Sequence, residues 1–168
     1  MQNKLPQRKL NRLRNYDYSQ NGCYFITICT KDKKCVLSHI KNSNDSYNIF
    51  AKEIIKTKIG NEFEKALAFS VNKYGVALDN YIIMPNHVHI LLTFENDRSV
   101  PFGGRGNPPL QKMIGEIKSY TTKIYRENEN NNSLILWQKS FYDHIIRNED
   151  DFQNTWNYIE HNALKEYK

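Results

Sequence analysis

Cysteine is scarce in this sequence, and its arrangement excludes the common cysteine-based scaffolds. The three cysteines, Cys23, Cys29 and Cys35, include no CxxC pair. An odd and widely spaced set supports neither a disulfide framework nor a cysteine zinc site. We therefore expect reduced, buried thiols in a cytoplasmic protein.

Long hydrophobic runs are also absent. No stretch approaches the ~20 apolar residues that a transmembrane helix needs, which argues against a membrane partner. Residues 1–14 are polar and lack the hydrophobic core of a secretory signal. The length of 168 residues suits one domain with its own core, so we expect a single domain over residues 1–168.

Acidic residues are fewer than basic ones, with 18 Asp and Glu against 24 Lys and Arg and a net charge of +6. This balance suits an anionic partner, although a solvated basic surface would have the same composition. Residues 1–20 form a basic arm that could lie along phosphates or remain a solvated terminus. The basic residues of this arm are Lys4, Arg8, Lys9, Arg12 and Arg14.

Hydrophobic periodicity predicts a mixture of strands and helices. The predicted elements are a strand at 22–30, a loop at 41–48, a helix at about 49–69, strands at 71–84 and 87–94, a helix at 110–126, a break at 128–133, a strand at 134–146 and a final helix from about 148. In the first strand, Phe25 and Thr27 share the face opposite Ile26 and Ile28. Residues 95–109 hold three of the seven glycines and three of the five prolines, which predicts a flexible loop.

Two histidines interrupt the most hydrophobic predicted strand. His87 and His89 are separated by one residue, so their side chains project from the same face of a strand. Paired imidazoles can hold a divalent metal, although an isolated pair more often lies on a half-solvated sheet face. The apolar surroundings and the Pro85-Asn86 bend just before the pair favour the metal site.

A metal site of this kind needs a further ligand and a nucleophile, and the final predicted helix offers both. Tyr158 and Asn162 are one turn apart on a face that flanks the apolar stripe, where the helix would meet the sheet. Asn162 supplies a carbonyl oxygen as a third ligand for Mg²⁺ or Mn²⁺. Tyr158 supplies a phenol that could attack phosphorus if a metal polarised the phosphate.

Other side chains compete for these roles. Most of the eleven tyrosines must be packing residues with satisfied hydroxyls. Tyr120 and Tyr125 flank the stripe of the preceding helix, and geometry alone ranks Tyr158 first with Tyr120 as the alternative nucleophile. We expect His144 to be a structural histidine bonded near Asp143.

At this point the sequence resembles a known family. Met84-Pro85-Asn86-His87-Val88-His89 resembles the metal-binding motif of the HUH single-tyrosine transposases, in which U is a hydrophobic residue. REP-associated tyrosine transposases are the branch that it resembles most. Further agreement lies in the blocks 16–27, Lys118-Ser119, 137–148 and Tyr158-Ile159.

The resemblance implies an α+β, ferredoxin-like sandwich with a mainly antiparallel sheet that includes the histidine strand. It also implies a catalytic tyrosine on a C-terminal helix. The family motif Tyr-Ile-x-x-Asn-Pro matches Tyr158 and Asn162, which favours Tyr158 over Tyr120. Mg²⁺ or Mn²⁺ would be held by His87, His89 and Asn162. Ala163 stands where the family has a helix-ending proline, so the helix can continue here.

The function implied by the resemblance is transposition by a single-stranded DNA endonuclease and strand transferase. The tyrosine would become linked to a 5′ phosphate at or near a DNA hairpin, leaving a free 3′ hydroxyl, and no nucleotide cofactor is implied. The alternatives are a domesticated hairpin-binding protein that does not cleave and a metal-dependent hydrolase. A monomer and a homodimer are both compatible with the sequence. The candidate DNA-binding residues are Arg8, Lys9, Arg12, Arg14 and Lys118.

Overall fold

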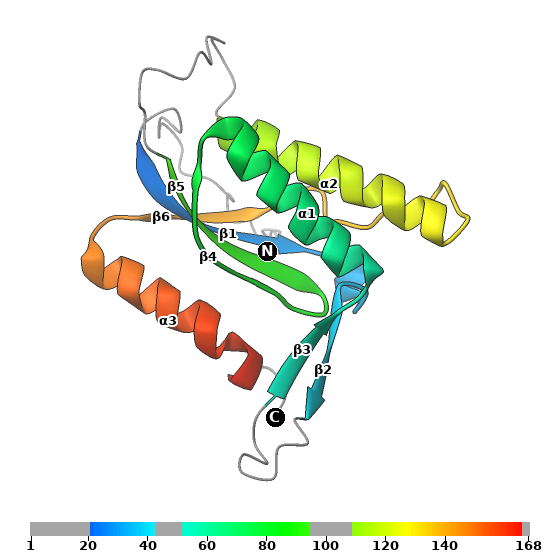
Figure 1. The fold of residues 1–168 in the computed structure, drawn as a ribbon, viewed down its shortest axis with the longest axis horizontal. Coiled ribbons are helices and arrows are strands. Elements are labelled where there is room, and N and C mark those ends of the chain that lie inside the picture. Colours follow the sequence, from blue (N-terminus) through cyan, green and yellow to red (C-terminus); the bar gives the residue numbers. More distant parts are fainter. Residues whose placement is uncertain (1–20, 43–51, 95–108, 166–168) are drawn as a thin grey trace, which may run out of the picture.

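The computed structural model describes residues 21–42, 52–94 and 109–165 (Figure 1). For residues 42, 52, 109 and 162–165 it describes the backbone only. The predicted basic arm, and all of the predicted 95–109 loop except Pro109, therefore lie outside the described residues. No helix in the described part of the chain is long and apolar enough to cross a membrane.

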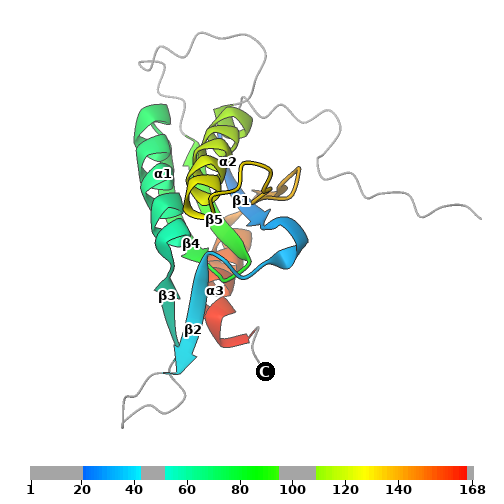
Figure 2. The same ribbon diagram turned by 90° about the vertical axis from the view of Figure 1, so that its right-hand side faces the viewer.

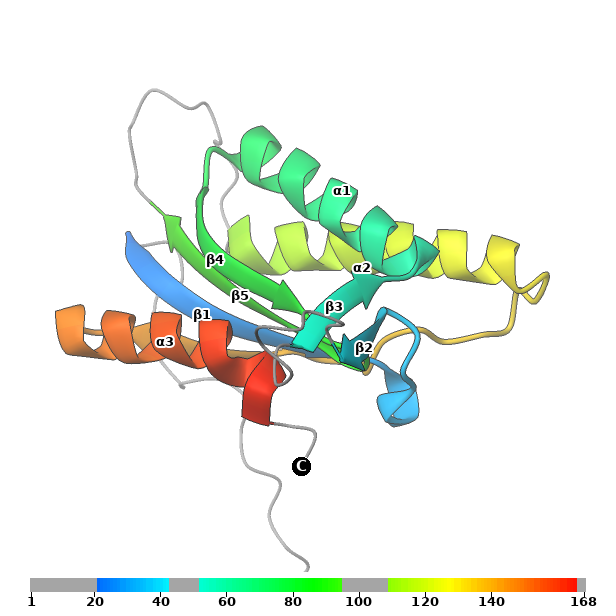
Figure 3. The ribbon, with the colours of Figure 1, turned by 60° about the horizontal axis from the view of Figure 1, so that its bottom comes forward.

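A four-stranded antiparallel sheet forms the centre of the molecule, with the strand order β4-β5-β1-β6. Helices α1 and α2 cover one face of this sheet, and α3 lies against the other face (Figures 1 and 3). The strands of the sheet are β1 (Gly22–Cys29), β4 (Ala77–Ile83), β5 (His87–Phe94) and β6 (Tyr142–Ile146), and the helices are α1 (Lys58–Tyr74), α2 (Pro109–Asn128) and α3 (Glu149–Lys165). The expectation of an α+β protein with a mainly antiparallel sheet is confirmed.

The order of these elements follows a simple plan. The succession β1-α1-β4-β5-α2-β6 is a strand–helix–strand repeated around a hairpin, the connectivity of ferredoxin-like folds. A short 3₁₀ turn, η1 (Lys31–Lys33), and a two-stranded ribbon of β2 (Ser38–Asn42) and β3 (Lys52–Lys56) are inserted between β1 and α1. Figure 2 shows this ribbon projecting beyond the end of the sheet, and α1 beside α2.

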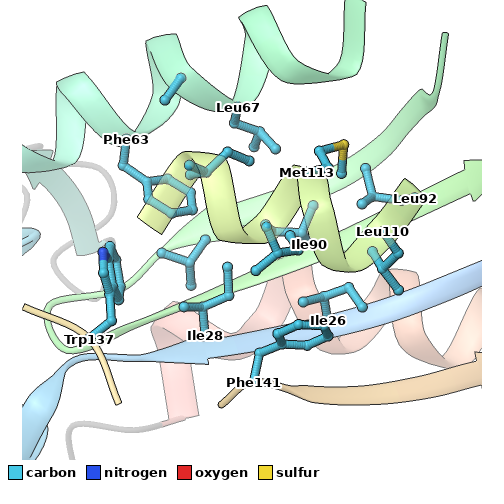
Figure 4. Close-up of a cluster of buried hydrophobic side chains, with 14 of the residues drawn as sticks. Ile26, Ile28, Phe63, Leu67, Ile90, Leu92, Leu110, Met113, Trp137 and Phe141 are labelled. Atoms are coloured by element: carbon cyan, nitrogen blue, oxygen red, sulfur yellow. The ribbon is translucent and has the colours of Figure 1, made fainter. Parts of the chain in front are cut away.

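Alternation along β1 and β5 separates an apolar side from a polar side. Ile26 and Ile28 of β1, and Ile90 and Leu92 of β5, are completely buried towards α1 and α2 (Figure 4). Phe63 of α1 packs on Trp137 with ring centroids 5.4 Å apart. Each such side chain contributes roughly 1.5–3 kcal/mol by leaving water. The residues that alternate with these along β1 and β5 point to the opposite face, towards α3.

The prediction of a helix at about 49–69 is wrong at the start of that segment. Residues 52–56 form strand β3, which pairs with β2, and helix α1 begins only at Lys58. Ile54 and Ile55 fit an apolar helix stripe, but their branched side chains also suit a strand. Thr57 ends the strand and caps the helix, because its Oγ1 accepts the Gly60 N–H and donates to the Val36 carbonyl.

The prediction of a strand at 71–84 is also wrong at the start of that segment. Helix α1 continues to Tyr74 and ends at Gly75, whose φ of 61° lies in the left-handed region. Glycine adopts this conformation without a steric cost, so it is a common helix terminator. The strand therefore starts at Ala77.

The strand predicted at 134–146 is shorter than expected, because only Tyr142–Ile146 joins the sheet. Before it, Trp137 makes an isolated bridge to Thr30, and its indole N–H donates to Thr121 Oγ1 at 2.9 Å. The amphipathic helix predicted at 110–126 is confirmed as α2. The final helix is confirmed as well, and Asn148 Oδ1 caps it by accepting the Asp151 N–H at 2.9 Å.

The three cysteines are free thiols, as predicted. Their predicted burial is wrong in part. Cys23 and Cys29 are half-buried in β1, whereas Cys35 is exposed in the segment that follows η1. A polar connecting segment on the surface does not bury its side chains as a central strand does.

Candidate active site

The histidine pair lies at the start of β5. The contact of His89 with Tyr158 of α3 places it on the face of the sheet that α3 covers. In the register of the sheet His87 lies opposite Cys29 and His89 opposite Thr27 of β1. The two imidazole rings are 4.6 Å apart between centroids. Both residues are buried, with 8% and 5% of their surfaces exposed. The pair is thus held side by side in the sheet.

The turn before the pair determines where β5 begins. The Met84 N–H donates to the His87 carbonyl at 2.9 Å and closes the β4–β5 hairpin. The carbonyl oxygen of Asn86 accepts both the N–H and the hydroxyl of Thr30, each at 2.9 Å. These bonds tie the turn to the end of β1, so the position of His87 follows from the backbone.

Each histidine is oriented through its Nδ1 atom. His87 Nδ1 lies 2.6 Å from Asn86 Oδ1, and His89 Nδ1 lies 2.8 Å from Thr27 Oγ1. An amide oxygen only accepts, so the His87 proton is on Nδ1 and the lone pair is on Nε2. With the same tautomer, His89 can donate to the threonine hydroxyl. Bonds of this kind orient the ligand histidines of metal sites.

The electrostatics of the pair favour neutral rings. Burial, together with a smaller contribution from the adjacent His87, lowers the pKa of His89 to about 3. Desolvation and a like-charged neighbour both penalise the protonated form. The Phe25 ring stacks on His89 with centroids 5.0 Å apart, which adds to the exclusion of water. Neutral imidazole is the form that binds a metal.

Tyr158 reaches this pair from α3. Its hydroxyl lies 3.5 Å from His89 Nε2, and the two rings are 5.2 Å apart between centroids. The tyrosine ring also makes an edge-to-face contact with Phe25, with ring centroids 5.9 Å apart. Ile159 and Thr155 are buried and anchor this side of the helix. Tyr158 therefore lies at the seam between helix and sheet and keeps 41% of its surface exposed.

The predicted third ligand is placed only by its backbone. Asn162 lies one turn after Tyr158 within α3, and the helix continues past Ala163 to Lys165. Its side chain is outside the described part of the structure. Among the described residues, no group of three or more His, Cys, Asp or Glu side chains could hold a metal. The described donor set is thus two imidazole nitrogens, which fit a divalent transition metal such as Mn²⁺.

The structure does not bring Tyr120 to the histidine pair. Tyr120 lies on α2, and its hydroxyl donates to Glu62 Oε2 of α1 at 2.8 Å. The carboxylate acceptor raises the pKa of this phenol. Both helices cover the opposite face of the sheet, so Tyr120 and Tyr158 are separated by the sheet itself (Figure 1).

The predicted DNA-binding residues lie apart from the pair or outside the described residues. Lys118 lies on α2, and its Nζ donates to the carbonyl oxygens of Gln138 and Ser140 at 2.7 and 3.2 Å. The remaining candidates lie outside the described residues, and they are Arg8, Lys9, Arg12 and Arg14.

His144 is a structural histidine, as predicted, but the predicted partner is wrong. His144 Nε2 lies 3.0 Å from the carboxylate of Asp151 in the first turn of α3, and not against Asp143. Neighbouring residues on a strand point to opposite faces, so Asp143 points towards the helical layer formed by α1 and α2.

Sequence reasoning missed three supporting residues, which are Phe25, Thr27 and Asn86. Asn86 adjoins His87 in the motif and could have been suspected from that position. The roles of Phe25 and Thr27 depend on the pairing of β1 with β5. This pairing joins residues that are far apart in the sequence, since Thr27 and His89 are separated by 62 positions. No local pattern indicates such a pairing.

Comparisons with known proteins agree with this fold and place the chain among the transposases. It belongs to the IS200-like transposase family, whose model, described as "Transposase IS200 like", matches residues 47–162.

Individual relatives share between 19% and 30% of their residues with this chain. The chain is 30% identical over 176 residues to an uncharacterized protein of Haemophilus influenzae, covering 95% of this chain and 90% of that protein. It is 22% identical over 156 residues to the REP-associated tyrosine transposase of Escherichia coli K12, covering 93% and 74%. A solved REP-associated tyrosine transposase bound to a REP hairpin has the same fold, with a TM-score of 0.57, 19% identity, and coverage of 94% and 75%.

Proposed function

We propose that this chain is a metal-dependent single-stranded DNA endonuclease and strand transferase that acts at or near DNA hairpins. Membership of the IS200-like transposase family supports the class of reaction. The solved relative bound to a REP hairpin supports hairpin DNA as the substrate. The observation that carries the proposal is the 3.5 Å approach of the Tyr158 hydroxyl to His89 Nε2, across 69 residues of sequence.

The proposed metal site consists of His87 and His89, with Asn162 as the third ligand. Two neutral imidazoles with bonded Nδ1 atoms are suited to binding through Nε2. When bound, Mg²⁺ or Mn²⁺ would polarise the scissile phosphate and neutralise its developing charge. The residues of the chain do the rest, which is to orient the ligands and exclude water from the pair.

Tyr158 is the proposed nucleophile. Its ring packs against both His89 and Phe25, while its exposed side is open to an approaching strand. Attack forms a bond from the phenolic oxygen to phosphorus and breaks the bond from phosphorus to the 3′ oxygen. The phenol loses its proton, and the departing 3′ oxygen takes one up. Attack by an incoming 3′ hydroxyl reverses these changes, joins the new ends and regenerates Tyr158.

A covalent adduct assay tests the proposal. Labelled single-stranded hairpins from the sequence flanking the gene are incubated with Mn²⁺ or Mg²⁺ and separated on denaturing gels. We expect an adduct that requires metal and is lost in Tyr158→Phe and His87→Ala. Tyr120→Phe is a matched control, because Tyr120 and Tyr158 are similarly exposed, at 44% and 41%.

Other outcomes would separate the remaining functions. An adduct that survives Tyr158→Phe and is lost in Tyr120→Phe would move the nucleophile to α2. Turnover that is unchanged in Tyr158→Phe would indicate a hydrolase in which a metal activates water. Hairpin binding without cleavage under any metal would indicate a domesticated, non-cleaving hairpin-binding protein.

A further inference from the structure

The turn that leads into the histidine pair is held by a segment from another part of the chain. Residues 30–38 run from the end of β1 through η1 to the first residue of β2, beside the turn of the β4–β5 hairpin (Figure 3). Three backbone carbonyls at this turn accept hydrogen bonds from the segment. The donors and acceptors are Thr30 with Asn86, Leu37 with Pro85 at 3.0 Å, and Ser38 with Ile83 at 2.8 Å. We call residues 30–38 the clamp segment.

The donors in the clamp segment are shielded from water. Thr30 and Leu37 are completely buried, and Ser38 is only 2% exposed. A buried carbonyl that loses its hydrogen bond is costly, and water cannot easily replace the lost donor at this site. The conformation of the hairpin turn therefore depends on two side-chain hydroxyls, those of Thr30 and Ser38.

The backbone of the clamp segment is strained. Asp32 and Lys33 have φ angles of 56° and 53°, in the left-handed region that residues other than glycine seldom adopt. The Thr30 hydroxyl lies 2.9 Å from the Lys34 carbonyl and helps to close this bend. The bend reverses the chain, so that Thr30 and Leu37 both reach the hairpin turn. Strain of this kind persists only where surrounding contacts fix the chain, and it is concentrated at functional sites.

The clamp segment is itself fixed to the rest of the fold. On one side the Lys31 N–H donates to the Leu136 carbonyl at 2.7 Å. On the other side the Thr57 N–H, at the start of α1, donates to the Leu37 carbonyl at 2.9 Å. The hairpin turn is thus tied through the clamp segment to both α1 and the chain before β6.

The contact of the clamp segment with Asn86 leads to one histidine of the pair. Asn86 Oδ1 lies 2.6 Å from His87 Nδ1 and keeps the proton on that nitrogen. His87 Nε2 therefore carries the lone pair that binds a metal only while Asn86 keeps this position. His89 is oriented differently, through Thr27 of β1. The clamp segment thus acts on His87 alone.

We propose that Thr30 and Ser38 are positioning residues, which hold the hairpin turn so that His87 presents Nε2 to the metal. The inference rests on the proposed function, because it concerns the proposed metal site. Both residues act through backbone carbonyls and Asn86, in the way that outer hydrogen bonds fix the tautomer and orientation of ligand histidines.

Nitrogen NMR of the full chain, labelled with ¹⁵N-histidine and free of metal, tests the proposal. In the wild type, Nδ1 of His87 should be the protonated ring nitrogen. Thr30→Val replaces the hydroxyl with a methyl group, so Asn86 should lose its fixed position and the other tautomer of His87 should appear. The tautomer of His89 should stay unchanged. Thr30→Ser keeps the hydroxyl and should restore the wild-type signals.

Calorimetric titration with Mn²⁺ measures the consequence for metal binding. Thr30→Val should weaken binding by roughly tenfold, at the low end of the range for outer partners of metal ligands. Ser38→Ala removes the other hydroxyl and should weaken binding in the same direction. Thr121→Val is a matched control, because Thr121 is also completely buried and donates to a backbone carbonyl, that of Ile117, at 2.8 Å. It should lower the melting temperature and leave Mn²⁺ affinity unchanged.

The outcomes separate a positioning role from a structural one. If Thr30→Val and Ser38→Ala lower the melting temperature, as Thr121→Val does, but leave the His87 tautomer and Mn²⁺ affinity unchanged, the proposal is wrong. Should one of the two variants fail to fold, the other decides by the same measurements.

The measurements also distinguish this proposal from the proposed function. A changed His87 tautomer in Thr30→Val, with no Mn²⁺ binding by the wild type, would support the positioning role and overturn the metal site. Wild-type Mn²⁺ affinity and DNA adduct in Thr30→Val, with the adduct lost in Tyr158→Phe, would overturn the positioning role and support the proposed function.

Discussion

The two faces of the central sheet are built from the same strands, but one packs in the core and the other carries the candidate site. On β1, Ile28 is completely buried beneath the helical layer, whereas its neighbour Thr27 faces α3 and bonds to His89. On β5, Ile90 packs in the core and His89 faces Tyr158. One residue of displacement along a strand thus separates a side chain that stabilises the fold from one that shapes the site.

The largest expected effect is on the apolar face. Ile28→Ala should lower the free energy of unfolding by about 2–5 kcal/mol, because it leaves a cavity in a core that cannot fully collapse. Urea or thermal unfolding measures this change. Ile28→Val removes a single methylene and should cost only about 0.5–1.5 kcal/mol. A loss of less than about 1 kcal/mol for the alanine variant would show that this face is loosely packed.

The next effect concerns metal binding on the α3 face. Saturating Mn²⁺ should stabilise the wild type by about 2.7 kcal/mol at one hundred times its dissociation constant, and chelation should remove this gain. His89→Ala should abolish the Mn²⁺-dependent shift in melting temperature. His144→Ala is the control, since His144 bonds to Asp151 on the surface. An equal shift in His89→Ala would place the metal elsewhere.

Thr27→Ala sharpens the contrast with its neighbour Ile28. Loss of the bond to His89 Nδ1 should weaken Mn²⁺ binding by about 10–100-fold, because the ring loses its orientation. The cost in stability should be only about 1 kcal/mol. Calorimetric titration with Mn²⁺ measures the affinity. Thr93→Ala, which removes a threonine bond to Asp79 on β4, should leave that affinity unchanged.

The smallest effect is expected in the helical layer itself. Gly115→Ala should raise the free energy of unfolding by about 0.5–1 kcal/mol, because alanine favours the helix and its methyl group meets open space. Gly60→Ala should instead destabilise the protein, since a Cβ there would collide with the Leu37 carbonyl. Thermal unfolding of both variants compares the two glycines, and equal effects would contradict this account.

Periodicity succeeded where one structure alone could satisfy the pattern. The strands around Ile26 and His89 and the helices α2 and α3 were predicted with nearly correct bounds. It failed around Ile54 and Ile55, where the same apolar residues suit a strand or a helix turn. The pairing of this segment with β2 and the Thr57 cap, which are tertiary contacts, selected the strand.

The candidate site likewise has one part that the sequence predicts and one part that it does not. The placement of His87 and His89 on one face, and of Tyr158 beside the buried stripe of its helix, follows from the repeat of each element. Their meeting does not, because it joins positions that are 69 residues apart in the case of His89 and Tyr158.

The sequence by itself determined which side chains share a face, because the repeats of strand and helix are properties of the local backbone. Only the tertiary structure decided which faces meet. The pairing of β1 with β5 brought Thr27 to His89, and the packing of α3 brought Tyr158 there. The position of Tyr120, whose hydroxyl bonds to Glu62 of α1, was decided in the same way. Such contacts depend on burying apolar surface between distant segments, which no local pattern encodes.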